Sequence, residues 1–138
     1  MARIIIIDDD EGLRNTLSRV LKGAGHTVAT AINGYQGVQL FRAEPADLII
    51  TDIMMPYGGL PTIRVLRDEN PGLKIIAMSG AGQPHLDVAG GLGATSTLAK
   101  PFLPKELIEA VNAVLAPPAP TRTLYPVPDV MASPPSSA

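Results

Sequence analysis

The 138-residue chain contains no cysteine, which excludes both disulfide bonds and thiolate metal sites. It has no tryptophan and only 4% aromatic residues, which argues against a surface that stacks nucleic-acid bases. Lysine and arginine (11) are outnumbered by aspartate and glutamate (13), so the basic excess of a nucleic-acid-binding domain is missing. No apolar run approaches the roughly 20 residues that cross a bilayer, and the N-terminus lacks a secretory signal pattern. We therefore expect a cytoplasmic protein with no nucleic-acid or membrane partner.

Polar residues follow four short apolar runs of the chain. The runs and their following residues are Arg3–Ile7 with Asp8 and Asp9, 48–51 with Asp52, 75–78 with Ser79, and 97–99 with Lys100. Aliphatic runs of this length are typical of buried parallel strands. Since the carboxyl ends of parallel strands meet at the edge where open α/β sheets bind ligands, these polar residues are expected to lie together. Clustered carboxylates repel one another without a cation, and oxygen ligands suit a hard ion such as Mg²⁺.

Helical periodicity and turn residues separate these runs along the chain. Apolar residues that recur every three or four positions predict amphipathic helices, and proline and glycine mark where they start and stop. The expected strands are 3–7, 26–31, 47–51, 74–78 and 95–99, and the expected helices begin near Leu13, Asn33, Pro61, Gln83 and Pro104. Strands that alternate with helices in this way predict an α/β fold with a parallel sheet.

The composition changes at Ala116. Residues 116–138 contain seven prolines and only two charged residues, Arg122 and Asp129. A segment with so few core-forming residues is not expected to pack. The sequence thus predicts one stand-alone domain over residues 1–116 and a proline-rich disordered tail over 117–138 that the chemistry does not need.

Asp52 is the candidate nucleophile, because a carboxylate can accept a phosphoryl group to form an aspartyl phosphate. Phosphoryl transfer depends mostly on positioning and on neutralising the charge of the oxygens. Asp8 and Asp9 would hold Mg²⁺ together with Asp52. Lys100 would neutralise a second phosphoryl oxygen as a point charge, and Ser79 would hydrogen-bond a third.

These motifs resemble the receiver domain of two-component response regulators over residues 3–115. The matching features are the acidic pair, the phosphoacceptor in the run Asp52-Ile-Met-Met-Pro, the hydroxyl of Ser79, and Lys100-Pro101, at spacings of 43, 27 and 21 residues from Asp9 onward. The resemblance implies a flavodoxin-like fold, with five parallel strands in the order 2-1-3-4-5 and helices on both faces. It also implies that the Lys100–Pro101 peptide is cis.

The resemblance further implies a function. Such a domain takes a phosphoryl group onto Asp52 from a sensor histidine kinase or phosphotransfer protein, with Mg²⁺ that also binds the backbone carbonyl of Met54. It promotes its own phosphorylation and dephosphorylation but is not a turnover enzyme. Its output is contact with a downstream protein, and we expect a monomer or weak dimer.

Three features depart from the family pattern. The loop expected at 56–59, after Asp52, is about one residue shorter than usual. Thr97 stands three residues before the lysine, where many relatives carry an aromatic side chain that moves inward on activation. The helix expected over 83–92 is rich in glycine, so residues 80–93 are expected to take up the movement instead.

Three other functions are alternatives for a chain with these features. A haloacid-dehalogenase-like phosphatase has similar groups, but its nucleophile lies on the first strand and its acidic pair comes late, the reverse of the order here. A nucleotide-binding module would need a glycine-rich phosphate loop, which this chain lacks. A pseudo-receiver, which acts as a phosphorylation-independent interaction module, remains the alternative because of Thr97.

Overall fold

The computed structural model describes residues 1–55, 59–80 and 82–116, in which strands and helices alternate. The strands are β1 (Arg3–Ile7), β2 (Thr27–Ala31), β3 (Leu48–Asp52), β4 (Lys74–Ser79) and β5 (Ser96–Ala99). The helices are α1 (Glu11–Gly23), α2 (Gly34–Ala43), α3 (Leu60–Glu69), α4 (Gln83–Leu92) and α5 (Pro104–Leu115). The main difference from the sequence prediction is that Asp52 and Ser79 are the last residues of their strands rather than the first after them. Backbone pairing does not depend on side-chain polarity, and Asp52 still pairs with Met78.

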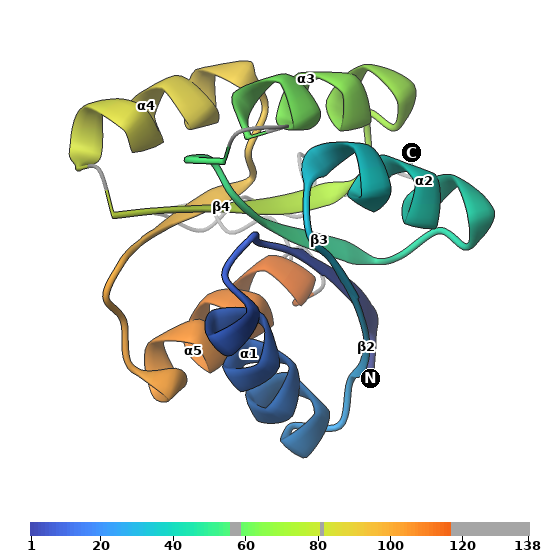
Figure 1. The fold of residues 1–138 in the computed structure, drawn as a ribbon, viewed down its shortest axis with the longest axis vertical. Coiled ribbons are helices and arrows are strands. Elements are labelled where there is room, and N and C mark those ends of the chain that lie inside the picture. Colours follow the sequence, from blue (N-terminus) through green and yellow to red (C-terminus); the bar gives the residue numbers. More distant parts are fainter. Residues whose placement is uncertain (56–58, 81, 117–138) are drawn as a thin grey trace, which may run out of the picture.

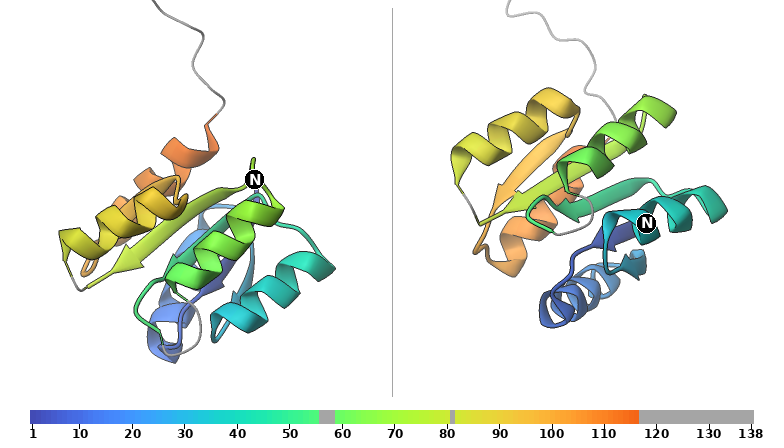
Figure 2. Two further views of the ribbon diagram at one scale, coloured as in Figure 1. Left: turned by 90° about the horizontal axis from the view of Figure 1, so that it is seen from above. Right: turned by 45° about the horizontal axis from the view of Figure 1, so that its top comes forward.

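All five strands are parallel and lie in the order β2-β1-β3-β4-β5, which confirms the predicted fold. Helices α2, α3 and α4 cover one face of the sheet, and α1 and α5 cover the other (Figure 1). Figure 2 shows the same three-layer arrangement from two further directions. The carboxyl ends of the strands therefore meet at one edge between the two helical layers.

The continuous isoleucine run of β1 is explained by this covering of both faces. Ile4, Ile5, Ile6 and Ile7 are all fully buried. Ile5 and Ile7 contribute to the core beneath α2, α3 and α4, whereas Ile4 and Ile6 contribute to the core beneath α1 and α5. A strand that is buried on both faces has no solvent side, so it shows no alternation of polar and apolar residues.

Arg67, near the end of α3, donates hydrogen bonds that stabilise the turn between α4 and β5. Its Nε and Nη2 atoms donate to the carbonyl oxygen of Gly93 at 3.1 and 2.8 Å, and its Nη1 atom donates to that of Pro71 at 2.6 Å. Gly93 has a φ of +120°, and a Cβ there would lie 2.8 Å from Cγ of Arg67. Helix α4 has no side-chain cap at its N-terminus, and Gly93 is the residue that caps its C-terminus. The hydrogen bonds from the Arg67 guanidinium to Gly93 therefore hold the C-terminal end of this helix.

We expect Arg67→Met to lower the free energy of unfolding by about 1–3 kcal/mol, because the partly buried carbonyl group of Gly93 loses two donors that carry a charge. Arg64→Met is the matched control on the same helix, since Arg64 is 64% exposed and pairs with Asp68 along the surface. The control is expected to change stability by less than about 0.5 kcal/mol. Denaturant unfolding of both variants checks this, and equal losses would contradict it.

Within the described ranges, no helix is both long and apolar enough to span a membrane. The predicted tail over 117–138 and most of the predicted loop at 56–59 lie outside the described residues.

Candidate functional site

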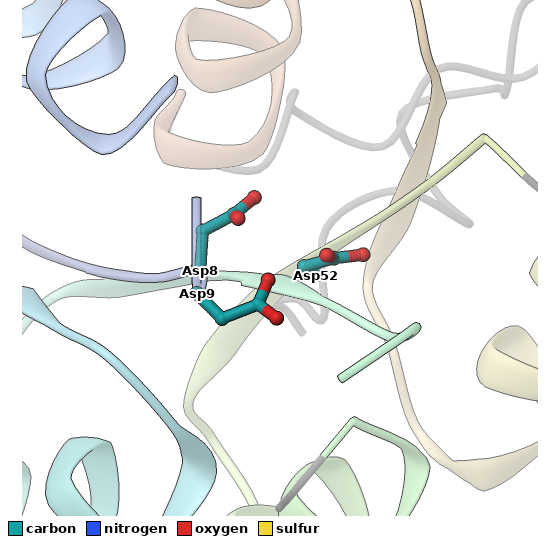
Figure 3. Close-up of side chains that lie close together, drawn as sticks. All are labelled: Asp8, Asp9 and Asp52. Atoms are coloured by element: carbon teal, nitrogen blue, oxygen red, sulfur yellow. The ribbon is translucent and has the colours of Figure 1, made fainter. Parts of the chain in front are cut away.

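Three carboxylates meet at the carboxyl edge of the sheet. Asp8 follows β1, Asp52 ends the neighbouring strand β3, and Ile7 and Thr51 pair just before them. One carboxylate oxygen from each of Asp8, Asp9 and Asp52 lies within 4.8 Å of the others (Figure 3). Asp8 is fully buried and Asp52 is 5% exposed, whereas Asp9 is exposed. The strands thus bring together the acidic residues that the sequence predicted to be neighbours.

Asp8 is held on several sides. Its backbone N–H donates to the carbonyl of Ala31 at 3.1 Å, and its Oδ1 atom accepts from the N–H of Asp10 at 2.9 Å. Asp10 in turn caps α1, because its side chain accepts from the N–H of Leu13 at 3.1 Å. The turn between β1 and α1 is therefore fixed by its own residues, which is the role expected of a carboxylate at a helix N-terminus.

Lys100, which follows β5, joins two of the carboxylates. Its Nζ atom lies 3.0 Å from Oδ2 of Asp8 and 3.4 Å from Oδ2 of Asp52. The peptide between Lys100 and Pro101 is cis, as the resemblance implied. One cation thus offsets part of the repulsion between the two most buried carboxylates.

The surroundings of Asp52 shift the pKa of its carboxyl group in opposing directions. Burial raises the pKa of Asp52 above its ordinary value, and the nearby charge of Asp8 raises it further. The N–H of Met54, which donates to Oδ1 at 3.1 Å, and the ammonium group of Lys100 act against this rise. Burial is the largest influence, so the pKa of Asp52 in the metal-free protein is raised.

We expect Asp52→Asn to raise the melting temperature of the metal-free protein at pH 7. Since folding raises the pKa of Asp52 above about 3.8, its ionised form costs the folded state stability at neutral pH. This cost shrinks as the pH falls through the raised pKa and disappears below the unfolded value. Melting curves from pH 4 to 7 measure the effect, and a destabilised variant at pH 7 would contradict it.

Ser79 and Met54, the other two predicted site residues, also lie at this edge. Ser79 ends β4, is 1% exposed, and its carbonyl accepts from the N–H of Lys100 at 2.9 Å. Met54 lies two residues beyond Asp52, with its N–H on the Asp52 carboxylate and its side chain half exposed. Every predicted residue is therefore within the same group of strand ends.

Arg14 is a residue near the site that the sequence reasoning missed. It is the fourth residue of α1, and its Nη1 atom donates to the carbonyl oxygen of Asp8 at 2.8 Å. The sequence signal for this contact was an arginine four residues after Asp10, because residues at this spacing lie on the same face of a helix.

The ligand atoms at this edge suit a hard divalent cation. All three side chains of the cluster offer carboxylate oxygens, and the chain has no cysteine that would favour a softer metal. Mg²⁺ is commonly bound by one or two carboxylates together with the oxygens of a phosphate substrate. The cluster can hold such an ion, and Lys100 supplies a second positive charge beside it.

Comparison with known proteins gives curated relatives of the chain. Response regulator MprA of Mycobacterium ulcerans is 34% identical over 115 residues, and DNA-binding response regulator MtrA of Mycobacterium tuberculosis is 38% identical over 116. The matches cover 82% of this chain and 50% of each relative. The chain therefore spans about half the length of the curated relatives it matches.

Solved structures show the same fold. Chemotaxis protein CheY4 of Vibrio cholerae has a TM-score of 0.78 at 29% identity, and the match covers 83% of this chain and 99% of CheY4. A receiver domain protein from Clostridium thermocellum has a TM-score of 0.77 at 28% identity, with 83% and 94% covered. The family model for the response regulator receiver domain matches residues 4–112. With the sheet order and the strand-end cluster, this match shows that the chain belongs to the family of response regulator receiver domains.

Proposed function

We propose that the chain is a phosphoacceptor that takes a phosphoryl group from a histidine kinase, or from a phosphotransfer protein, onto Asp52. The observation that carries the proposal is the position of Lys100, whose Nζ lies 3.4 Å from Oδ2 of Asp52 at the edge of an acidic cluster. A lysine between carboxylates neutralises charge, and phosphoryl transfer needs this kind of neutralisation at the transferred oxygens.

In the proposed step, a carboxylate oxygen of Asp52 attacks the phosphorus atom of a phosphohistidine. A phosphorus–oxygen bond forms and the phosphorus–nitrogen bond breaks, so the imidazole leaves with that electron pair. The product is an acyl phosphate on Asp52. The N–H of Met54, which donates to Oδ1 at 3.1 Å, holds the carboxylate in position and leaves Oδ2 on the side of Lys100.

Asp8, Asp9, Asp52 and the backbone carbonyl of Met54 are the proposed ligands of Mg²⁺. When bound, this ion offsets the negative charge of the phosphoryl oxygens and of the attacking carboxylate. Lys100 neutralises another phosphoryl oxygen, and the hydroxyl of Ser79 donates a hydrogen bond to the third. Together these groups would meet all three oxygens of the transferred group.

The proposed output is contact with a downstream protein, and we keep the expectation of a monomer or weak dimer. MtrA is named a DNA-binding response regulator, but the chain matches only half of that relative. In the described part of the chain, the match is to the receiver domain. Nucleic-acid and membrane partners are not part of the proposal.

The second candidate is a pseudo-receiver that binds partners without phosphorylation. Thr97, which is half-buried in β5, favours it, because this position lacks the aromatic side chain through which many receivers respond. Its small, β-branched side chain has few rotamers and cannot reproduce such a movement.

The test is to incubate the chain with acetyl phosphate and Mg²⁺ and to measure its intact mass. We expect a gain of one phosphoryl group, which hydroxylamine removes and excess chelator prevents. A parallel assay with a phosphomonoester should show no turnover, whereas sustained hydrolysis would indicate a phosphatase. If no phosphoryl group is added while the protein is folded, the pseudo-receiver reading replaces the proposal.

A further inference from the structure

Arg14 contacts the acidic cluster through the backbone rather than through a carboxylate. Its Nη1 atom donates to the carbonyl oxygen of Asp8 at 2.8 Å, and the contact is partly buried. A hydrogen bond from a guanidinium group to a carbonyl oxygen is of the stronger, charge-assisted kind. None of the proposed transfer steps uses Arg14, and its contact therefore calls for another explanation.

The carbonyl of Asp8 belongs to the peptide group that leads to Asp9. A peptide group is planar, so fixing the direction of its carbonyl also fixes where the next residue begins. The N–H of Asp8 and both of its carboxylate oxygens are held by Ala31, Asp10 and Lys100. Arg14 holds the remaining polar group of Asp8, its backbone carbonyl. It thereby also holds the peptide group between Asp8 and Asp9.

Asp9 has little else to position it. Its side chain is exposed, and no hydrogen bond or ion pair found among the described residues involves its carboxylate. An oxygen of Asp9 nevertheless lies within 4.8 Å of those of Asp8 and Asp52. The direction of this carboxylate is therefore set by the backbone before Asp9 together with the rotamer of its own side chain.

We propose that Arg14 is a positioning residue of the Mg²⁺ site, which fixes the Asp8–Asp9 peptide so that the carboxylate of Asp9 faces Asp52. The inference rests on the proposed function, since it requires that the cluster hold Mg²⁺. For the Mg²⁺ affinity of a variant without Arg14, this proposal predicts the opposite of what the charge of Arg14 alone would predict. A nearby positive charge repels Mg²⁺, so its removal alone would tighten binding, whereas the loss of positioning weakens it.

The experiment titrates Mg²⁺ into the full chain by calorimetry for the wild type, Arg14→Met and Arg14→Gln. We expect both variants to bind Mg²⁺ about tenfold more weakly, the effect typical of groups that orient metal ligands. The amide chemical shifts of Asp9 and Asp10 should also change in the metal-free variants. Arg19→Met is the matched control, because Arg19 is exposed on the same helix, and it should leave the affinity and both shifts unchanged.

The outcomes separate the two proposals. If the wild type itself binds no Mg²⁺, the proposed function fails. If the wild type binds and both folded Arg14 variants bind equally well or more tightly, the positioning inference is overturned. Should Arg14→Met not fold, Arg14→Gln decides alone, and a fall in its melting temperature with unchanged affinity would show a purely structural role.

Discussion

Asp52→Asn is expected to abolish phosphoryl labelling of the chain by acetyl phosphate. An amide is not a nucleophile toward phosphorus, and no other carboxylate of the cluster has the same surroundings. Asp8 is fully buried, and both of its carboxylate oxygens are hydrogen-bonded. Among the described residues, Asp9 forms no ion pair with Lys100. We expect a loss of at least about 100-fold in the labelling rate, which corresponds to roughly 3 kcal/mol of barrier. Intact-mass spectrometry over time measures it.

Asp52→Asn is also expected to stabilise the metal-free fold, so unfolding would not explain a loss of labelling. Asp68→Asn is the matched control, since Asp68 is exposed on α3 and pairs with Arg64 away from the acidic cluster. It should be labelled at the wild-type rate. Persistent full labelling of Asp52→Asn would move the acceptor to another residue and overturn the proposed transfer step.

The sequence was enough to predict the sheet and the cluster because both follow from local patterns. Each apolar run that ends in a polar residue is a few residues long, and parallel strands necessarily bring such ends to one edge. Asp52 could be placed beside Asp8 for this reason, although 44 residues separate them. The glycine-rich segment after Gly82 forms a helix over the residues predicted for it, since Leu86 and Ala89 still give it a buried side.

Contacts between distant helices could not be predicted in this way. The hydrogen bonds of Arg67 to Gly93 and Pro71 depend on how α3 lies beside the turn before β5. The different burial of Asp8 and Asp9 depends on which side of the turn each side chain leaves, and an Asp-Asp pair looks alike in the sequence. Such features arise from packing, for which a single sequence carries no periodic signal.

Asp9→Ala is expected to remove Mg²⁺ binding and phosphoryl labelling together. Asp9 is the most exposed carboxylate of the cluster, and none of the described hydrogen bonds holds its side chain, so its oxygens are available to a metal. Groups that only orient metal ligands affect affinity by about 10–100-fold. Removal of a direct ligand should therefore weaken Mg²⁺ binding by at least about 100-fold. Without the ion, the charge of the phosphoryl oxygens is left to Lys100 alone, and the labelling rate should fall with the affinity.

Stability distinguishes this effect from damage to the fold. Because the side chain of Asp9 supports no described contact, the melting temperature of the metal-free Asp9→Ala protein should match or exceed that of the wild type, as one repelling charge is removed. Glu11→Ala is the control, since it removes an exposed carboxylate two residues away at the start of α1 and should keep both Mg²⁺ binding and labelling. Calorimetry and mass spectrometry on the same samples decide the matter. Unchanged Mg²⁺ affinity in Asp9→Ala would mean that the ion lies elsewhere, because a direct ligand cannot be removed without a loss of affinity.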